Sequence, residues 1–207
     1  MEDSPDEFFM GVDLTTSPRR VSLTCILSPS GETVFHEPLL DDEIVGLAER
    51  YAPACIAVDA PLTLPTSLQG RGYRLCDREV RRMGIRIFPL SLGSMRMLAL
   101  RGVGLAARLR GLGFEVIETF PSGAQRVLGL WGRGGRKASV LARGLRKLGL
   151  KIPRGPSLDM IDAATCAYVA LLYRRGLCMV FGDPSEGLLY LPAKSTRVRT
   201  FKYGRSF

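Results

Sequence analysis

At Phe8-Phe9-Met10-Gly11-Val12-Asp13, a continuous apolar run ends in a carboxylate. A run of this kind predicts a strand that is buried on both faces of a sheet. Side chains alternate along a strand, so Asp13 is expected on the face of Gly11, opposite Val12. Because a charge is expensive beside an apolar core, a carboxylate in a covered central strand is hard to explain as a solvated group. Asp13 is therefore the first candidate for a functional residue.

The residues after this run predict an antiparallel meander. An alternating run at 20–27, the turn Ser28-Pro29-Ser30-Gly31 and residues 32–37 have the period-two spacing and the turn chemistry of a hairpin. A helix is expected over 41–51, because apolar residues recur at helical spacing and acids occupy its first turn. The continuously apolar run Cys55-Ile56-Ala57-Val58 is typical of a central parallel strand.

The middle of the chain changes character. Residues 61–112 combine Pro and Gly punctuation with dense arginine and two helix-like stretches, at 76–83 and 94–109, which predicts a helical, Arg-rich insertion over the sheet. After it we expect a strand, two helices, a helix capped by Ser157 and buried against the sheet, and a last short strand, at 114–119, 122–130, 137–148, 158–174 and 188–191. This order predicts one mixed α/β domain, residues 1–207, with helices on both faces.

Composition excludes several classes of protein. The chain has 207 residues, 46% of them hydrophobic, which is enough for one buried core. Its N-terminus is acidic and unlike a signal peptide, and its longest apolar stretch, 163–173, is too short to span a bilayer, so we expect a soluble, cytoplasmic protein. Five separated cysteines and the single histidine, His36, offer no zinc-ligand spacing. Buried free thiols and a surface histidine are expected instead.

The positive charge of the chain is uneven. Its net charge is +9, and arginine supplies most of the 29 basic residues. Arginines concentrate at 71–110, and the stretch 194–207 contains basic residues and no acid. Arginine suits bidentate phosphate contacts, so this distribution favours nucleic acid as a partner. The alternative is an arginine bias set by genome composition or growth temperature.

Two further carboxylates end predicted parallel strands. Asp59 follows the strand at 55–58 just before Pro61, and Glu118 ends the strand at 114–119 just before Pro121. The carboxyl ends of such strands are where ligands bind in open α/β sheets, so both side chains are expected to reach one crevice. Taken singly, each could be a cap or turn carboxylate.

A third pair of acids opens the last predicted helix. Asp159 and Asp162 are three residues apart, so they share one helix face. The helix dipole alone could explain Asp159 in the first turn. Asp162 lies further in, between Ile161 and Ala163, where the dipole explains it less well. Acids placed repeatedly beside apolar core indicate a shared cation.

The order of five short motifs resembles a known family. The motifs are Gly11-Val12-Asp13, Val58-Asp59-Ala60-Pro61-Leu62, Arg74-Leu75-Cys76-Asp77, Glu118-Thr119-Phe120-Pro121-Ser122 and Asp159-Met160-Ile161-Asp162-Ala163. Over nearly its whole length, the chain resembles the predicted nucleases of RNase H fold catalogued as domain of unknown function 429. The resemblance implies an RNase H-like mixed sheet, with a three-stranded antiparallel meander plus parallel strands, whose acids converge on divalent metal.

The Asp-x-x-Asp pair is similar to the arrangement in RuvC-type junction resolvases. This similarity implies one set of metal ligands, namely Asp13, Asp59, Asp159 and Asp162. Glu118 has no counterpart in the resolvase pattern, although it matches the Glu-x-x-Pro motif of the first family. It could be a fifth ligand, a group that supports the ligands, or a substrate contact, and it is kept as a catalytic candidate.

These ligands predict a metal-dependent phosphodiesterase that acts on nucleic acid. Oxygen ligands without His or Cys suit Mg²⁺ or Mn²⁺, and two ions about 3.5–4 Å apart would support in-line displacement at a phosphodiester. In this scheme Asp13 bridges both ions, Asp59 holds one, and Asp159 with Asp162 holds the other. Four basic residues are candidates for phosphate contacts, with a solvated or salt-bridged role as the alternative: Arg71, Arg74, Arg78 and Lys137.

Other functions remain open at this stage. A non-catalytic nucleic-acid-binding or scaffold protein could share the same fold, and a small phosphohydrolase could act on free nucleotides. A resolvase-like activity would require a homodimer to cut two strands symmetrically. The Gly-rich segment 129–139 lacks the Gly-Lys-Ser/Thr junction of a phosphate loop and is interpreted as a flexible basic loop.

Overall fold

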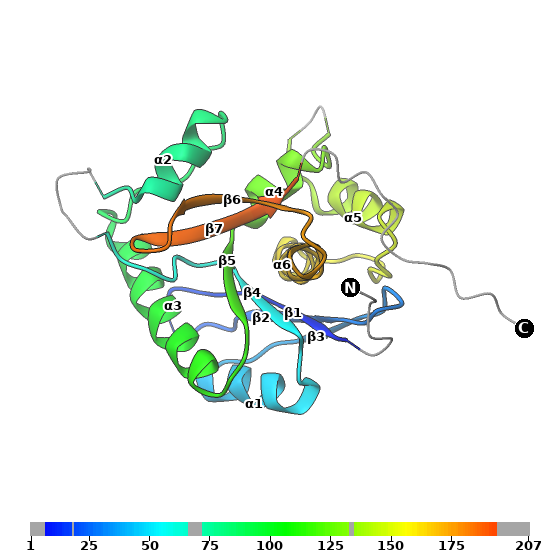
Figure 1. The fold of residues 1–207 in the computed structure, drawn as a ribbon. Helices are drawn as coiled ribbons and strands as arrows, with labels where there is room; N and C mark the ends of the chain where they lie inside the picture. Colours follow the sequence, from blue (N-terminus) through cyan, green and yellow to red (C-terminus); the bar gives the residue numbers. More distant parts are fainter. Residues whose placement is uncertain (1–6, 18, 66–71, 133–134, 194–207) are drawn as a thin grey trace, which may run out of the picture.

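The structure is a computed structural model that describes residues 7–17, 19–65, 72–132 and 135–193. Its centre is one seven-stranded sheet with the order β3-β2-β1-β4-β5-β7-β6 (Figure 1). The strands are β1 Phe9–Asp13, β2 Leu23–Leu27, β3 Thr33–His36, β4 Cys55–Val58, β5 Val116–Thr119, β6 Cys178–Asp183 and β7 Gly187–Pro192. Arg71 and the basic stretch 194–207 lie outside the described residues.

The sheet is mixed, as the sequence predicts. Strands β1, β2 and β3 form the antiparallel meander, with Gly11 opposite Cys25. Strand β1 then pairs in parallel with β4, and β4 pairs in parallel with β5. The apolar run of β1 is buried on both faces, because Phe9 belongs to one core cluster and Met10 and Val12 to the other, which confirms the interpretation of the opening stretch.

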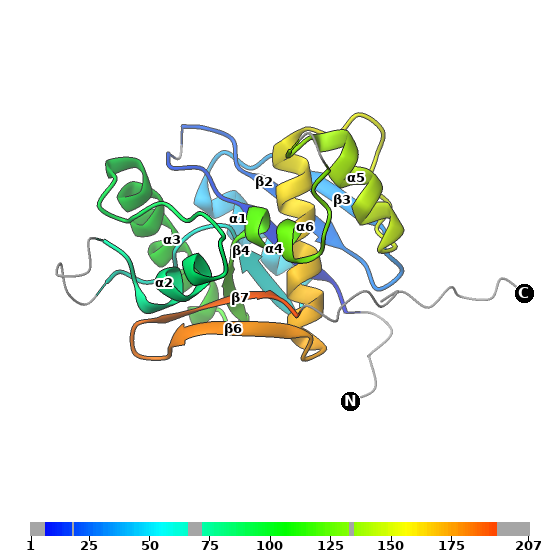
Figure 2. The ribbon, with the colours of Figure 1, turned by 90° about the horizontal axis from the view of Figure 1, so that it is seen from above.

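Helices cover both faces of the sheet. Helices α4 (Pro121–Val127), α5 (Ala138–Lys147) and α6 (Leu158–Arg174) lie on one face, with α6 packed across β1, β2 and β4 (Figure 2). Helices α1 (Asp41–Tyr51) and α3 (Gly93–Gly111) bury a second apolar cluster on the opposite face. Helix α2 (Leu75–Arg82) packs on the β6–β7 hairpin.

Helix α6 lies unusually close to β1. A Cβ atom placed on Gly11 would come within 2.1 Å of the Ala163 carbonyl oxygen and 2.2 Å of the Ala167 amide nitrogen. Only glycine therefore allows this approach. The helix starts where expected, because the Ser157 hydroxyl oxygen accepts a hydrogen bond from the Met160 amide at 3.1 Å. Asp13, two residues beyond Gly11 on the same strand face, consequently faces the start of α6.

One expectation about connections needs correction. The sequence predicts a single last strand, whereas the structure has a hairpin, β6 and β7, that follows α6 and extends the sheet through parallel pairing of β7 with β5. Residues 178–183 contain only a short apolar stretch, which is a weak signal for a strand. They form β6 by pairing with β7 in the hairpin. Within 61–112, α3 lies on the sheet face opposite α6 and buries Leu105, Ala106 and Leu109 in the second core.

The thiols and the histidine are unremarkable in chemistry. Cys25, Cys55, Cys76 and Cys166 are buried free thiols, as expected, and Cys178 is half-buried. His36 is half-buried on β3 and shares a hydrogen bond of 3.1 Å with the Tyr51 hydroxyl, so it is less exposed than predicted. No helix among the described residues is long and apolar enough to cross a membrane.

Candidate functional site

Asp13 and Asp59 lie side by side at the carboxyl ends of β1 and β4. Val12 pairs with Val58 in the parallel ladder, and the Asp59 amide donates a hydrogen bond to the Val12 carbonyl oxygen at 2.8 Å. This bond carries the ladder one residue past β4 and fixes the Asp59 backbone next to Asp13. The juxtaposition follows from strand order, because neighbouring parallel strands end at the same edge of a sheet.

Asp162 comes from the second turn of α6 and is only 8% exposed. Its Oδ1 atom accepts a hydrogen bond from Gln125 Nε2 at 2.8 Å and forms an ion pair with Arg136. Gln125 also binds Arg136 through its Oε1 atom, at 3.1 Å. Residues from α4 and from the loop before α5 therefore hold this carboxylate in place over the sheet.

The three carboxylates act on one another electrostatically. Burial, followed by the charges of Asp162 and Asp159, raises the pKa of Asp13 to about 7. Burial and the charges of Asp13 and Asp162 hold the pKa of Asp59 well above its ordinary value. Burial also raises the pKa of Asp162, although the Arg136 and Gln125 bonds act in the opposite direction. The cluster thus gathers more negative charge than Arg136 compensates.

Asp159 has a different environment. It lies in the first turn of α6 and is exposed. Its charge contributes to the raised pKa values of both Asp13 and Asp162, which places it near the cluster. Asp13, Asp59 and Asp162, with Asp159 at their exposed side, offer only oxygen ligands. This donor set fits a hard divalent cation such as Mg²⁺ or Mn²⁺.

Glu118 lies at the same sheet edge but on the opposite face. It pairs with Val58 in the parallel ladder, yet it alternates with Ile117, which packs on the α6 side. The Glu118 carboxylate binds Arg74 through both oxygens, at 2.5 and 2.7 Å, and accepts the Leu62 amide at 2.8 Å. The structure therefore separates Glu118 from the group formed by Asp13, Asp59 and Asp162.

Arg74 does not fit the expected role of a phosphate clamp. It is 1% exposed, and all five of its guanidinium N–H groups are used by Asp77, Glu118 and the Thr63 hydroxyl. Burial by itself would lower the pKa of Arg74, but the two carboxylates raise it above its ordinary value. These bonds leave no donor for a phosphate. The sequence pattern could not reveal that Glu118 and Asp77 would surround this arginine.

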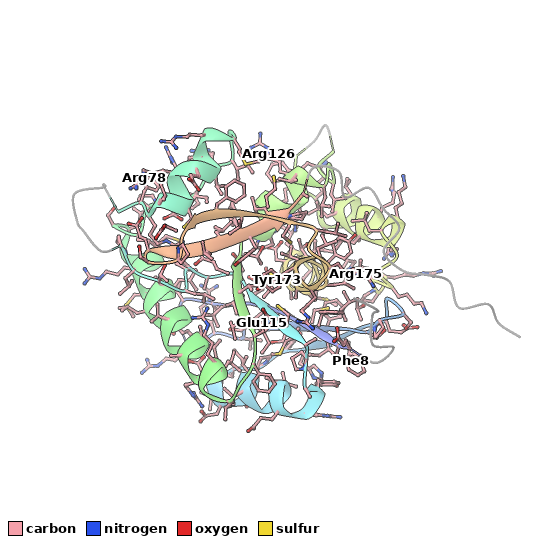
Figure 3. The ribbon with its side chains drawn as sticks, viewed as in Figure 1. Phe8, Arg78, Glu115, Arg126, Tyr173 and Arg175 are labelled. Atoms are coloured by element: carbon pink, nitrogen blue, oxygen red, sulfur yellow. The ribbon has the colours of Figure 1, made fainter. Side chains whose placement is uncertain are left out.

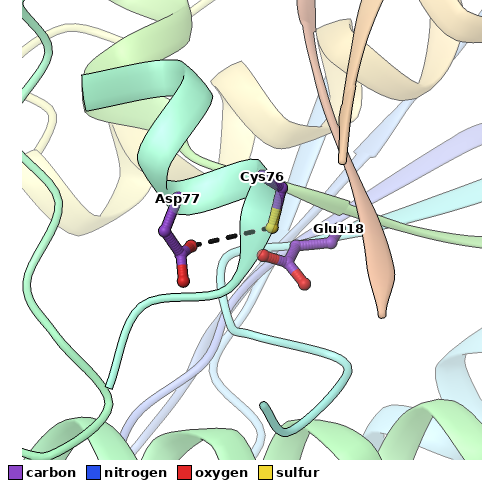
Figure 4. A group of neighbouring side chains, drawn as sticks. All are labelled: Cys76, Asp77 and Glu118. Atoms are coloured by element: carbon purple, nitrogen blue, oxygen red, sulfur yellow. Dashed lines mark hydrogen bonds between the residues drawn. The ribbon is translucent and has the colours of Figure 1, made fainter. Parts of the chain in front are cut away.

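Among the described residues, the one group of three possible ligands with metal-like spacing surrounds Arg74 and contains none of the four candidate aspartates. One ligand atom each from Cys76, Asp77 and Glu118 lies within 4.8 Å of the others (Figure 4). By spacing alone this buried group could hold a metal ion. However, the Arg74 guanidinium already occupies the charge-balancing position, and burial raises the pKa of the Cys76 thiol to about 12. A protonated thiol and two carboxylates bound to arginine are poor metal ligands.

The remaining basic candidates lie at the surface. Arg78, on α2, donates to the Tyr73 carbonyl oxygen at 3.0 Å and lies 4.0 Å from Glu186, with 43% of its side chain exposed. Figure 3 shows Arg78 on α2 and Arg126 on α4. Lys137 is exposed at the start of α5. Arg71 lies outside the described part of the chain.

Two residues that the sequence pattern did not single out hold the carboxylate site together. Arg136 belongs to the segment interpreted as a flexible basic loop, but it forms an ion pair with Asp162 and a hydrogen bond with Gln125. Gln125 is fully buried on α4. A polar residue on the buried face of a predicted helix was the one signal that could have identified it.

Comparisons with known proteins identify the family and the fold of this chain. A family model described as "Protein of unknown function (DUF429)" matches residues 11–186, a span that includes all four aspartates. Thermus thermophilus RuvC, solved in complex with a Holliday junction substrate, matches with a TM-score of 0.51 and 15% identity, covering 82% of this chain and 96% of that one.

A second structure of Thermus thermophilus RuvC matches with a TM-score of 0.45 and 18% identity, over the same shares of the two chains. The search of curated proteins found no significant match. The fold is therefore an RNase H-like α/β fold, as the sequence motifs implied. Because the family model spans most of the sheet and the whole carboxylate site, the chain belongs to the DUF429 family.

Proposed function

We propose that the protein is a metal-dependent phosphodiesterase that cleaves nucleic acid. The observation that supports this proposal is that Asp13, Asp59 and Asp162 lie near one another: the pKa of each is raised, and among the described residues Arg136 forms an ion pair with Asp162 alone. Such a cluster is costly unless it serves a purpose, and an external divalent cation would relieve the repulsion. The RNase H-like fold shared with a protein solved on a DNA junction adds support.

In this proposal each aspartate has one metal-binding role. Asp13 would bridge two ions, Asp59 would hold one, and Asp162 with Asp159 would hold the other. When bound, Mg²⁺ or Mn²⁺ would activate a water and stabilise the departing oxygen of the phosphodiester. Both bonds to Asp162 use Oδ1, so Oδ2 has no hydrogen-bond donor among the residues that the structure describes. Gln125 thereby orients the carboxylate while leaving one oxygen for a ligand.

The chain itself would keep these ligands rigid. Gly11 lets α6 lie directly on β1, which sets the distance between Asp13 and Asp162. Glu118, Arg74 and Asp77 tie the segment after β4 to α2, because Glu118 also binds the Leu62 amide three residues beyond Asp59. In this proposal Glu118 positions the segment that carries Asp59 and is not a metal ligand.

Nucleic acid is the proposed substrate because of the charge of the chain. The net charge of +9 favours a polyanion, and exposed Arg78 and Lys137 could contact phosphates. Arg71 keeps the same expected role, although it lies outside the described residues. A homodimer and a cytoplasmic location also remain predictions. Light scattering of the purified protein would measure the oligomeric state.

A cleavage panel tests the proposal. Wild-type protein is incubated with Mn²⁺ or Mg²⁺ and with single-stranded, duplex, hybrid and branched nucleic acids, and with free nucleotides. We expect metal-dependent cleavage of at least one polynucleotide and a loss of about a thousandfold or more in Asp13→Asn and Asp162→Asn. Asp42→Asn, at an exposed aspartate of α1, is the matched control.

Each other outcome has a definite meaning. Full activity in both variants would contradict the proposed site. Hydrolysis of free nucleotides alone would identify a small phosphohydrolase. Binding of nucleic acid without cleavage, and without Mn²⁺ binding in a calorimetric titration, would favour a non-catalytic scaffold.

A further inference from the structure

A small apolar pocket lies beside Asp59 at the carboxyl end of the parallel strands. Its volume is about 170 Å³, and its lining includes Asp59, Pro61, Phe88, Leu90, Met95 and Leu98. Most of these side chains belong to the segment 87–98, which includes the end of the connection from α2 to α3 and the start of α3. The pocket is smaller than the roughly 300–1,000 Å³ typical of sites for drug-sized ligands, so it suits a single ring system.

Exposed apolar side chains surround this pocket. Phe88 is 61% exposed although it lines the pocket, and Leu92 and Met97 are exposed in the same segment. A single exposed apolar residue needs no explanation, but a cluster around a pocket is typical of a binding surface. Phe88 presents an aromatic face to solvent at little conformational cost, because it has only two side-chain torsions.

The inner wall of the pocket is polar but already satisfied. Arg74, Asp77 and Glu118 line it, and they bond to one another and to neighbouring groups as described above. Thr119 donates its hydroxyl to the Tyr190 carbonyl oxygen at 2.9 Å. The wall therefore offers no unpaired guanidinium to an anion. An uncharged, flat group fits this surface better than a phosphate does.

Positive charge flanks the same segment. Arg86 and Arg96 are exposed, and neither has an ion-pair partner among the described residues. Arg86 lies two residues before Phe88, and Arg96 directly follows Met95. A polyanion that places an uncharged ring in the pocket would find these charges next to its backbone.

We propose that this pocket accepts one unpaired nucleobase, stacked on Phe88, of the nucleic acid whose backbone lies at the aspartate site. The inference rests on the proposed function and deepens it, because it names the substrate class: single-stranded nucleic acid, or a strand with an unpaired base beside the cleaved phosphate. A base held in a duplex cannot enter the pocket unless it leaves the stack. Stacking on an aromatic side chain requires no particular base.

Fluorescence of a 2-aminopurine base tests the proposal in metal-free buffer. The probe is a single-stranded DNA 12-mer with 2-aminopurine at its centre, and the competitors are the same strand with an abasic centre and the corresponding duplex. Wild-type protein should quench the probe and bind it about tenfold more tightly than the abasic strand or the duplex. Phe88→Ala should bind the probe about tenfold more weakly and lose the preference over the abasic strand.

The controls separate stacking from general exposure. Phe88→Tyr keeps the aromatic face and should bind within about twofold of wild type. Met97→Ala removes another exposed apolar side chain of the same segment that does not line the pocket, and it should also bind within about twofold. Because Phe88 is mostly exposed, the variants should fold normally, which a cooperative thermal transition verifies.

Several results would overturn the inference. Equal binding of the intact and abasic strands by wild type, or unchanged binding in Phe88→Ala, would exclude base stacking here. A duplex that binds as tightly as the single strand would exclude the substrate class. If wild type then still cleaves a polynucleotide with Mn²⁺, the proposed function stands without this pocket. If Asp13→Asn keeps full cleavage, the proposed function fails, whatever the binding assay shows.

Discussion

Two carboxylate clusters lie at the same edge of the sheet and differ in what balances their charge. In the first, Glu118 and Asp77 surround Arg74, whose guanidinium satisfies both. In the second, the charges of Asp13, Asp59 and Asp162 act on one another, and among the described residues only Arg136 pairs with one of them. The first is a completed internal network, whereas the second carries uncompensated charge. Proximity of carboxylates alone therefore does not identify a metal site, and the supply of internal cations must also be considered.

Breaking the completed network should have the largest effect on stability. Glu118→Gln leaves the buried Arg74 with a single carboxylate partner, so the free energy of unfolding should fall by about 3–5 kcal/mol. Urea denaturation followed by circular dichroism measures this change. Arg108→Met breaks the exposed pair with Asp42 and should cost less than about 1 kcal/mol. Equal losses in the two variants would show that burial does not distinguish the pairs.

Adding metal should stabilise the protein through the second cluster alone. Mn²⁺ at about 100 times its dissociation constant should raise the free energy of unfolding by about 2.7 kcal/mol. Asp162→Asn should lose most of this gain, and Glu118→Gln should keep it, because Glu118 is bound to Arg74 on the other sheet face. Thermal unfolding with and without Mn²⁺ measures the difference. Loss of the gain in Glu118→Gln would instead place the ion in the cluster around Arg74.

The metal-free protein should become less stable as pH rises from about 4 to about 7. The pKa of Asp13 is raised to about 7 in the folded state, so the folded protein holds a proton there that the unfolded chain releases near pH 4. The stabilisation is complete below pH 4 and is lost as pH passes 7. Asp13→Asn removes the charge, so at pH 8 it should be more stable than wild type, by about 1 kcal/mol after solvent screening.

Chemical denaturation in EDTA at pH 5 and pH 8 tests this sign. The difference between Asp13→Asn and wild type should grow with pH. Asp42→Asn, at an exposed aspartate, should show no such growth. A wild-type protein that gains stability relative to Asp13→Asn at pH 8 would contradict the repulsion between the aspartates.

The smallest effect is expected from Arg136. This guanidinium competes with an added ion for Asp162, so Arg136→Ala should bind Mn²⁺ about three- to fivefold more tightly. Lys137→Ala is the matched control, because Lys137 is the exposed neighbour of Arg136. Isothermal titration calorimetry compares the two variants. Weaker Mn²⁺ binding in Arg136→Ala would mean that Arg136 mainly orients Asp162.

Much of the fold could be predicted from local patterns. The apolar run that ends at Asp13, the alternation at 23–27 and the Ser157 cap are signals that act over a few residues, and each lies where the structure has the element. The β6 strand was missed because its short run becomes a strand only through pairing with β7. The core residues of α3 could not be identified from the sequence, because their burial depends on α1 and on strands that lie far away in sequence.

In the candidate site, too, some features follow from local sequence patterns and others from tertiary contacts. The sequence by itself determined which carboxylates end strands and which share a face of α6, because strand and helix periodicity are properties of neighbouring residues. Only the tertiary structure decided which cation meets which acid. Arg74 reaches Glu118 across 44 residues and Arg136 reaches Asp162 across 26, so the balance of charge is set by distant segments meeting in space. Electrostatic interaction depends on distance and burial, which periodicity does not encode.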